Sequence, residues 1–323
     1  MSQKSMEEEV FKLAPMEEKD RFIGSKLVSM KEAVSSIPDG SHIALGGFSI
    51  TRCIIAFTHE MIRQRKRDLT ISQGLAGMDT DLLVGGGCVR HLIYGGGSID
   101  RFGLLECINR AIGNKTITVE EYSGLSVSFK FLAGALGLPF LPVKSIMGSD
   151  IYKNLKKESG NKLVVEATCP FTGASLLYLR ALTPEVAILH VNQSDEEGNA
   201  IIYGPRWDNP ELAKASKRII LISEEIVPGG YLQKVAESVF VPSFRVEKVV
   251  HVPFGAHPTA VYRAYDYDAD HLKYYAEQHK EEKKFEKYLD NYVIGVSDFY
   301  EYLERIGGLR RLLNLKSDVL LGY

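Results

Sequence analysis

The feature that most constrains this fold is the alternation of short apolar, β-branched runs with segments of helical periodicity. Runs rich in Val, Ile and Leu predict strands at 42–45, 69–72, 89–95, 116–121, 163–167, 186–192, 200–204, 218–223 and 246–252. Apolar residues at helical spacing predict helices at 51–65, 101–112, 123–136, 209–217 and 231–239. Strands that alternate with helices predict an α/β fold, with an open and mostly parallel sheet that helices cover on both faces.

The ends of this pattern set the expected domain organisation. The segment 186–204 breaks the alternation, because only a polar turn separates its two strands, and it predicts a hairpin at an edge of the sheet. Residues 1–26 are polar and charged without clear periodicity, which predicts an N-terminal tail or a loosely docked helix. We therefore expect one domain over 27–267. Residues 268–323 are rich in Lys, Glu and Tyr, and they predict a helical C-terminal extension of that domain.

The composition narrows the class of function. The chain has 323 residues and a formal net charge of -2, so its charge predicts neither nucleic acid nor an anionic membrane as a partner. No apolar run reaches the roughly 18 residues of a membrane span, and the acidic N-terminal segment does not resemble a signal peptide. The four cysteines show no C-x-x-C pair, which argues against a zinc site and predicts a reducing, cytoplasmic compartment.

A glycine pair stands between the first predicted strand of this pattern and the helix after it, in 39-DGSHIALGGFSITR-52. Glycine tolerates positive φ and lets a ligand approach the main-chain N–H groups closely. Further glycine clusters occur at 85–87 and 95–97, and turns of this kind can share one crevice beyond the carboxyl ends of strands. Neither a G-x-G-x-x-G fingerprint with its acidic residue nor a P-loop motif is present, which disfavours dinucleotide and P-loop folds.

The run 39-DGSHIALGGF-48 resembles the signature of the A-type half of class I CoA-transferases, an Asp-Gly turn and a strand that ends in Gly-Gly-Phe. Ketoacid-specific members continue with a further Gly and Pro, whereas Arg52 in this chain resembles the A-type (α) subunit of the glutaconate CoA-transferase branch. The resemblance covers nearly the whole chain. It includes 137-GLPFLPV-143, 186-VAILHVNQSDEEGN-199, 255-GAHPTAVYRAYDYD-268 and 305-RIGGLRRLLNLKSDVLLGY-323.

Members of this family use a glutamate as covalent nucleophile, within a Ser-Glu-Asn-Gly-like motif of the B-type half. This chain offers only 223-SEEI-226, which lacks the Asn-Gly. The resemblance therefore implies the α subunit of a heteromeric acyl-CoA:carboxylate CoA-transferase whose catalytic Glu lies on a β subunit. It implies an acyl-CoA thioester and a small dicarboxylate or other acid as substrates, with no metal and no tightly bound cofactor. The accepting acid stays open, as does the choice between a heterotetramer and a hetero-octamer.

Within this chain the resemblance implies supporting roles rather than a catalytic residue. The N–H groups of Gly46 and Gly47 are candidates for stabilising the tetrahedral oxyanion of acyl transfer. Phe48, Arg52 and Ser98 are expected to bind substrate. The Arg52 guanidinium matches the geometry of a carboxylate, and its alternative role is an inter-subunit or core ion pair. The alternative role of Ser98 is to cap the helix that follows it.

Other polar residues favour structural roles. His257 is expected to hold its loop, because no carboxylate partner for a general base can be named. His190 lies on an apolar strand and is expected to be a satisfied core residue. Cys53 is expected to act as a small buried hydrophobe rather than a nucleophile. Asp79 and Asp81 fit loop solvation or helix capping better than a metal site.

Three alternative functions are open to a chain of this type. Relatives of the glutaconate branch include hydrolases that open ring CoA thioesters, and these carry an acidic residue where Gly124 aligns in this chain. Glycine has no acid or base to offer, which disfavours hydrolysis. A decarboxylase of methylglutaconyl-type thioesters differs mainly in its partner chain and stays open. A sugar-phosphate sensor is disfavoured by the lack of an N-terminal helix-turn-helix and by the mild net charge.

Overall fold

The structure is a computed structural model that describes residues 24–160 and 162–317. Seven strands form the main sheet in the order β11-β10-β8-β1-β2-β3-β4, and each neighbouring pair is parallel. These strands are β1 (His42–Leu45), β2 (Leu69–Gln73), β3 (Val89–Tyr94), β4 (Thr118–Glu121), β8 (Val186–Ser194), β10 (Arg218–Ile226) and β11 (Val246–His251). The predicted α/β fold with an open, mostly parallel sheet is confirmed.

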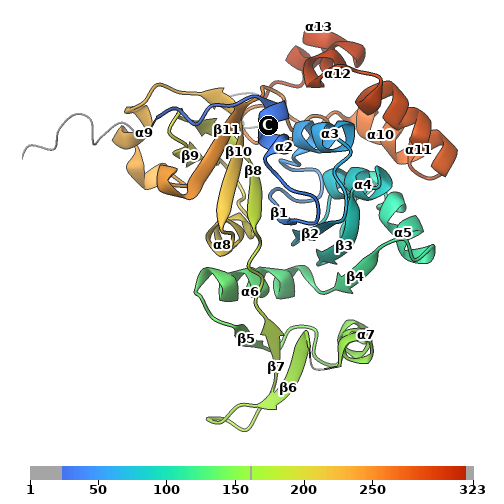
Figure 1. Cartoon of the computed structure of the whole chain (residues 1–323), viewed down its shortest axis with the longest axis vertical. Helices are drawn as coiled ribbons and strands as arrows, with labels where there is room; N and C mark the ends of the chain where they lie inside the picture. Colours follow the sequence, from blue (N-terminus) through green and yellow to red (C-terminus); the bar gives the residue numbers. More distant parts are fainter. Residues whose placement is uncertain (1–23, 161, 318–323) are drawn as a thin grey trace, which may run out of the picture.

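Helices cover both faces of this sheet (Figure 1). One face carries α2 (Met30–Ser35), α3 (Ile55–Arg63), α4 (Met78–Gly85) and α5 (Glu106–Gly113), and the other carries α6 (Gly124–Ala135) and α8 (Asn209–Ala215). Successive side chains of a strand point to opposite faces. Ile43 and Leu45 of β1 therefore join the hydrophobic core under α3 and α4, whereas Ala44 joins the core under α6 and α8. The apolar runs of the sequence follow from burial on both sides.

The predicted hairpin is present, but it does not lie at an edge. β8 pairs antiparallel with β9 (Ala200–Ile201), through Gln193 and Ser194. β8 itself is central, between β10 and β1. Its pairing with the short strand β1 ends at Ile188, so the last part of β8 has a free side that β9 occupies.

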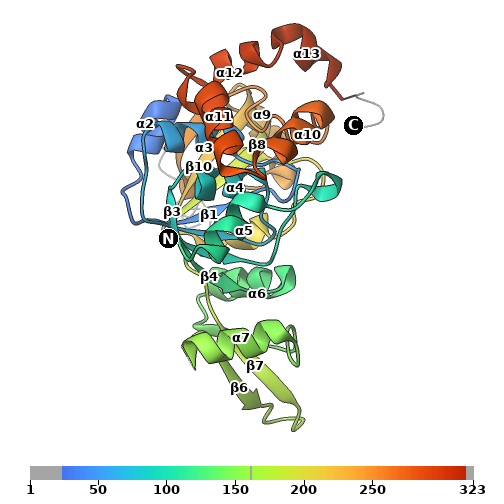
Figure 2. The same cartoon turned by 90° about the vertical axis from the view of Figure 1, so that its right-hand side faces the viewer.

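A second, three-stranded antiparallel sheet extends from the body of the protein (Figures 1 and 2). Its order is β5-β7-β6, with β5 (Phe140–Val143), β6 (Val164–Thr168) and β7 (Ser175–Arg180), and α7 (Asp150–Ser159) accompanies it. Val164, Leu177 and Leu179 are fully buried on its inner face, in the same core as α6. The sequence analysis predicted β6 but missed β5, β7 and α7.

The C-terminal region is helical, as expected. Its elements are α10 (Ala269–Gln278), α11 (Glu282–Leu289), the π-helical turn η5 (Asp290–Ile294), α12 (Phe299–Arg305) and α13 (Gly308–Asn314). They pack outside α3 and α4 and share the core beneath these helices. Short helical segments elsewhere are η2 (Asp100–Phe102), α9 (Tyr231–Lys234), η3 (Ala236–Ser238) and η4 (Ser243–Arg245). The predicted tail at 1–26 lies almost wholly outside the described residues, and the domain boundaries stay predictions.

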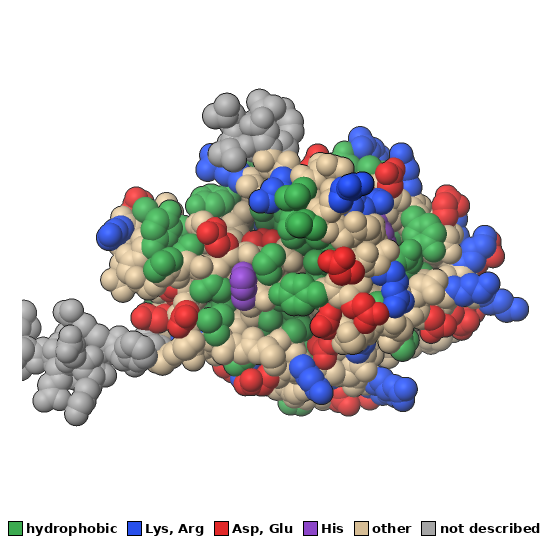
Figure 3. All heavy atoms as spheres, turned by 90° about the horizontal axis from the view of Figure 1, so that it is seen from above, with side chains coloured by type: hydrophobic (Ala, Val, Ile, Leu, Met, Phe, Trp, Pro, Cys, Tyr) green, Lys and Arg blue, Asp and Glu red, His purple; other side chains and the backbone are tan. Residues whose placement is uncertain are grey.

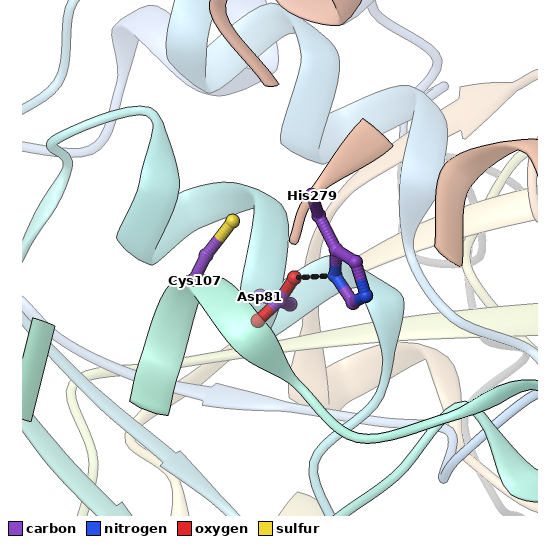
Figure 4. A group of neighbouring side chains, drawn as sticks. All are labelled: Asp81, Cys107 and His279. Carbon is purple, nitrogen blue, oxygen red and sulfur yellow. Dashed lines mark hydrogen bonds and ion pairs between the residues drawn. The ribbon is translucent and has the colours of Figure 1, made fainter. Parts of the chain in front are cut away.

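A buried carboxylate ties this C-terminal region to the helices on the sheet (Figure 4). Asp81, in the first turn of α4, accepts hydrogen bonds from the Tyr275 hydroxyl at 2.6 Å and from Nδ1 of His279 at 2.8 Å. Its other oxygen accepts the main-chain N–H of Ile108 in α5 at 3.1 Å. Asp81 is fully buried, so the loop-solvation alternative is wrong, whereas its bond to the first turn of α5 fits the helix-capping alternative. The carboxylate instead joins α4, α5 and the end of α10.

A second buried network fastens the loop before α10. Nε2 of His257 lies 3.1 Å from Asp268, and its Nδ1 lies 2.8 Å from the hydroxyl of Tyr302. Arg311 donates two hydrogen bonds to Asp268, at 2.6 and 2.7 Å. Although burial acts in the opposite direction, the hydrogen bonds from His257 and Arg311 hold the pKa of Asp268 well below its usual range. His257 thus has a carboxylate partner that the sequence did not reveal, within a structural network.

The surface and the cysteines complete this description. Acidic, basic and hydrophobic side chains are interspersed on the face that carries the C-terminal helices (Figure 3). None of the helices within the described ranges is long and apolar enough to cross a membrane. All four cysteines are free thiols, and only Cys169 is not buried.

We expect Asp81→Ala to lower the free energy of unfolding by about 3 kcal/mol or more, because a buried group that loses its hydrogen-bond partner costs about 1–3 kcal/mol and this change leaves three such donors. Urea unfolding measures the loss. Asp270→Ala is the matched control, since Asp270 is exposed in the first turn of α10. Its effect should stay within about 1 kcal/mol, and equal losses for the two variants would contradict the structural role of Asp81.

Candidate active site

The carboxyl ends of β1, β2 and β3 lie at one edge, because the three strands are parallel neighbours. A glycine follows each strand directly: Gly46, Gly74 and Gly95. A Cβ on Gly95 would collide with the Gly74 carbonyl and with the backbone of Gly124, so glycine is required for this approach. The turns after β1 and β3 therefore share one edge, as expected. The cluster at 85–87 ends α4 and precedes β3, which places it at the opposite edge.

The two glycines after β1 are needed for close packing. A Cβ on Gly46 would lie 2.7 Å from Cδ2 of Leu189. Gly47 has a φ of +79°, and a Cβ there would overlap the main-chain carbonyl of Arg52. The N–H of Gly46 donates to the Ile188 carbonyl at 2.9 Å, and that of Gly47 donates to Oδ1 of Asn209 at 3.3 Å. Both amides thus have acceptors within the chain, and the oxyanion role stays a prediction that requires Asn209 to release Gly47.

Arg52 carries a charge without a partner. Its side chain is fully buried, and none of its three guanidinium nitrogens has a hydrogen-bond partner among the described residues. Burial lowers the pKa of Arg52 to about 10, and the nearby positive charge of Arg206 acts in the same direction. The core ion pair that the sequence left open is therefore wrong within the described part of the chain. A buried, unpaired cation is costly, so this site favours an anion that the described residues do not supply.

The backbone around Arg52 is held firmly in place. Its N–H donates to the carbonyl of Ala260 at 2.8 Å, and it adopts a positive φ of 51°. Phe48 and Thr51 exchange two hydrogen bonds of 2.9 and 2.8 Å, which close a tight turn just before Arg52. The ring of Phe48 lies 5.7 Å from that of Trp207, centroid to centroid. Phe48 thus contributes to an aromatic pair beside the glycine turn, and its substrate contact stays a prediction.

Ser98 makes the capping contact that the sequence offered as its alternative role. Its Oγ accepts the N–H of Asp100 at 3.1 Å, at the start of η2. Its carbonyl accepts the hydroxyl of Ser49 at 3.0 Å, which connects the turn after β3 with the turn after β1. Ser98 therefore lies in the same group of loops as Arg52. Contact with substrate stays a prediction.

Asp208 and Asn209 reach this edge from a distant part of the sequence, and the sequence analysis did not identify them. Asp208 is 2% exposed, and its Oδ2 lies against Gly74 with no hydrogen-bond partner among the described residues. Burial raises the pKa of Asp208 to about 7. Nδ2 of Asn209 is also buried and unpartnered within the described ranges. Asp208 precedes α8 and Asn209 begins it, and at such positions Asp and Asn usually indicate only a helix cap. The Asp208 side chain makes no capping hydrogen bond.

Glu224, the first of the two glutamates in 223-SEEI-226, is not free to act as a nucleophile. Glu224 lies 2.6 Å from Nε2 of His190 and accepts the N–H of Phe254 at 2.6 Å and the hydroxyl of Tyr265. These contacts fix both carboxylate oxygens. The expectation that His190 is a satisfied core residue is half right, because its Nδ1 has no partner among the described residues.

Two further predictions can be compared with the structure. Asp79 is fully buried and accepts the N–H of Ile54 at 3.2 Å, so it holds the residue just before α3 rather than facing solvent. Cys53 is buried, its thiol contacts the carbonyl of Ser49 at 3.2 Å, and burial raises its pKa well above the usual value. It therefore behaves as a packed thiol rather than a nucleophile.

Asp81, Cys107 and His279 form a group of potential metal ligands, since one ligand atom from each lies within 4.8 Å of the others (Figure 4). The hydrogen bonds of Asp81 to His279 and Tyr275 already satisfy the carboxylate. Burial and the neighbouring Asp81 raise the pKa of the Cys107 thiol, which disfavours the thiolate that a metal would need. The group lies where α4, α5 and the end of α10 meet.

Comparison with known proteins places this geometry in a family. Residues 27–252 match the coenzyme A transferase family. The chain belongs to this family. It is a CoA-transferase subunit, and its named relatives include the A-type subunits of a glutaconate CoA-transferase and a 3-oxoadipate CoA-transferase.

Three relatives define its position within the CoA-transferases. The A-type subunit of the glutaconate CoA-transferase of Acidaminococcus fermentans is 33% identical over 93% of this chain and 97% of its own length. The crystal structure of that enzyme superposes with a TM-score of 0.87, over 93% of this chain and 98% of the matched chain. The decarboxylase AibA/AibB matches with 31% identity and a TM-score of 0.70, over 82% of this chain and 99% of the matched chain. An uncharacterized Archaeoglobus fulgidus protein is 36% identical over 92% of this chain, which spans 66% of that protein.

Substitution of Gly47 should destabilise this CoA-transferase subunit more than substitution of Gly40. Both glycines have a φ of +79°, but a Cβ on Gly40 meets nothing within 4 Å. We expect Gly40→Ala to lower the free energy of unfolding by about 1 kcal/mol, the cost of the left-handed conformation. Gly47→Ala should cost roughly 2 kcal/mol more, because its Cβ overlaps the Arg52 backbone. Equal losses in thermal unfolding would mean that the backbone moves apart without cost.

Asp208 should make stability depend on pH. Its folded pKa of about 7 lies above the ordinary value of 3.8, so the folded protein binds this proton more tightly than the unfolded chain does. The native state is thus penalised as pH rises from about 4 to about 7, and the penalty is constant above that range. We expect Asp208→Asn to remove it, so that the difference in unfolding free energy between variant and wild type grows over this interval. A difference that does not change with pH would contradict the assignment.

Proposed function

We propose that this chain is the A-type subunit of a heteromeric acyl-CoA:carboxylate CoA-transferase that acts on a dicarboxylate. The observation that carries the proposal is the buried guanidinium of Arg52 at the glycine-rich edge of the sheet, which has no partner among the described residues. Such a group lowers the stability of the free protein, and an arriving carboxylate compensates for it through two parallel hydrogen bonds. A dicarboxylate can place one carboxylate on Arg52 and present the other to the reaction.

The nucleophile comes from the partner in this proposal, because Glu224 is held by His190, Phe254 and Tyr265. A glutamate on the β subunit, by this scheme, attacks the acyl carbonyl of the thioester, and the CoA thiolate leaves as a mixed anhydride forms. The thiolate then attacks the glutamyl carbonyl, which gives a glutamyl-CoA thioester and releases the first acid. A second acid reverses these steps and leaves as its CoA thioester, so one difficult exchange is divided into easier ones.

The residues of this chain bind and orient substrate in this scheme. Arg52 holds the distant carboxylate, and the pair of Phe48 and Trp207 provides an apolar wall beside it. Ser98 reaches the same loops from β3. CoA enters as a substrate, and no resident cofactor is required. The four free cysteines fit the reducing interior of a cell, where we place this activity.

Gly124 bears on the hydrolytic alternative. A Cβ on Gly124 would lie 3.3 Å from the Trp207 ring and 3.4 Å from the Gly74 carbonyl, so this position belongs to the candidate active site. Glycine has no group that activates water, and this supports transfer over hydrolysis. Decarboxylation is distinguished by experiment, since it releases CO₂ from the acyl-CoA without a second acid.

The test is Arg52→Lys in the complex of this chain with its β subunit. Lysine keeps the charge but loses the two-pronged geometry, and charged hydrogen bonds are worth about 1.5–3 kcal/mol. We expect kcat/KM to fall by about 10- to 150-fold for a dicarboxylate such as glutaconate, since each 1.36 kcal/mol corresponds to roughly tenfold in rate. A monocarboxylate such as acetate makes no such contact and should lose little. Equal losses for the two acids would contradict the substrate role.

Arg52→Met separates substrate binding from assembly. In the isolated chain it should raise the melting temperature, because it removes an unpaired buried charge. If Arg52 instead pairs with a carboxylate of the β subunit, the same change leaves that carboxylate unpaired and weakens the complex in sedimentation analysis. Unchanged assembly with loss of dicarboxylate turnover supports the proposal. The isolated wild-type chain serves as the inactive control, because the proposed nucleophile belongs to the β subunit.

A further inference from the structure

The loop 255–260, which follows β11, holds the backbone at Arg52. The N–H of Arg52 donates to the carbonyl of Ala260 at 2.8 Å. The next amide, that of Cys53, donates to Oγ1 of Thr259 at 3.1 Å. Two successive amides at the candidate active site are therefore bound by neighbouring residues of a loop that is distant in sequence.

The conformation of Arg52 requires such contacts. Its φ of 51° lies in the left-handed region, which a residue with a Cβ adopts only at a cost in free energy. A backbone of this kind persists where the surrounding structure fixes it. If Arg52 relaxed to a negative φ, its Cβ would turn and the guanidinium would leave its buried position. The hydrogen bonds from Arg52 and Cys53 to this loop therefore determine where the charge lies.

The hydroxyl of Thr259 is aimed by a second hydrogen bond. Thr259 is fully buried, and its Oγ1 donates to the carbonyl of Ala256 at 2.7 Å. This bond uses the hydroxyl proton, so Oγ1 can only accept from the N–H of Cys53. Valine has nearly the same shape as threonine but offers neither a donor nor an acceptor. The contact with Cys53 thus depends on the hydroxyl rather than on packing.

His257 connects the same loop with the C-terminal helices. Its Nε2 lies 3.1 Å from Asp268, and its Nδ1 lies 2.8 Å from the hydroxyl of Tyr302 in α12. Burial lowers the pKa of His257, although Asp268 acts in the opposite direction, so the ring is neutral at pH 7. The ionised Asp268 only accepts, so Nε2 carries the proton and Nδ1 accepts from Tyr302. Both ring nitrogens are therefore fixed.

Asp268 completes the connection. Its N–H donates to the carbonyl of Pro258 at 2.9 Å, and Arg311 of α13 donates two hydrogen bonds to its carboxylate. The match to the CoA-transferase family ends at residue 252, so the loop 255–260 and both helices lie beyond it. The part of the chain that follows the matched region thus fixes the backbone of Arg52.

We propose that Thr259 and His257 are positioning residues for Arg52, through which the C-terminal helices set the selectivity for a dicarboxylate. The proposal rests on the function proposed above, in which the Arg52 guanidinium holds the distant carboxylate. A two-pronged pairing tolerates only a small displacement of the guanidinium. A monocarboxylate that does not reach Arg52 is insensitive to that displacement. Loss of a hydrogen bond in this network should therefore change the choice of acid rather than the reaction in general.

The first test is Thr259→Val in the complex of this chain with its β subunit. We expect KM for a dicarboxylate such as glutaconate to rise by about tenfold, because small displacements of a binding group are costly. The kinetic constants for acetate should change little. Thr259→Ser keeps the hydroxyl and should restore most of the lost selectivity. An unchanged KM for the dicarboxylate, or an equal loss of activity towards both acids, would overturn the proposal.

The second test changes the C-terminal helices instead. Tyr302→Phe removes the hydroxyl on Nδ1 of His257 and keeps the ring. Tyr288→Phe is the matched control, because Tyr288 is also fully buried and its hydroxyl lies 2.9 Å from Nε2 of His271, a residue of α10. We expect only Tyr302→Phe to raise KM for the dicarboxylate, by about fivefold, as for the loss of one hydrogen bond. Equal effects of the two variants would mean that the core acts as a whole.

The third test does not depend on catalysis. Hydrogen exchange of the fragment 50–56, measured by mass spectrometry on the complex, should be about fivefold faster in Tyr302→Phe than in the wild type. Tyr288→Phe should leave it unchanged. Exchange that does not respond to Tyr302→Phe overturns the positioning role, even if Arg52→Lys discriminates between the acids. Faster exchange without such discrimination by Arg52→Lys supports the positioning of Arg52 and contradicts the proposed function instead.

Discussion

The parallel hydrogen-bonded pairing of β1, β2 and β3 is the constraint on which the rest of this structure depends. This pairing brings the carboxyl ends of the three strands to one edge of the sheet. Side chains on both faces of the strands are buried in the hydrophobic core. The connections after the strands must therefore turn within a few residues and pass close to one another. Gly46, Gly74 and Gly95 satisfy that requirement by the absence of a side chain. The backbone of the three turns is therefore packed closely at this edge.

Buried charges in this protein fall into two classes. Asp79, Asp81 and Asp268 each accept several hydrogen bonds from groups of this chain, and each joins helices or loops. Arg52 and Asp208 are as deeply buried, but they have nitrogen or oxygen atoms without partners among the described residues. Burial alone does not separate function from architecture here. Hydrogen-bonding capacity without a partner separates Arg52 and Asp208 from these three aspartates, and both residues belong to the candidate active site.

The sequence predicts this fold well where burial on both faces produces long apolar runs, as in β8 and β10. It fails for β5, because Pro142 interrupts the pattern in a strand that lies at the edge of the small sheet, where proline is tolerated. It fails for α4 because Asp79 and Asp81 in its first turn suggest a solvated loop, although partners distant in sequence bury both.

The candidate site was predictable only in its local part. Gly46, Gly47, Phe48 and Arg52 are close in sequence, and their pattern is specific enough to indicate a site. Asp208 is distant in sequence and reaches the site because it lies at the start of α8, which packs on the sheet. An Asp at the start of a helix indicates only a helix cap when it is judged from the sequence. Arg52 is unpaired because none of the other described residues places a hydrogen-bond acceptor at its guanidinium. No local pattern contains that information.

The attachment of the C-terminal helices bears on how this chain could change in length. The family match ends at residue 252, and the residues after it could be taken for an appendage. Yet Tyr275 and His279 complete the hydrogen bonds of a carboxylate in α4, and Tyr288 and Tyr302 form part of the same core. The C-terminal helices therefore form part of the main hydrophobic core. Loss of the C-terminal helices would leave the buried carboxylate of Asp81 without its hydrogen bonds from Tyr275 and His279. A shorter chain of this fold would therefore need an uncharged residue at position 81.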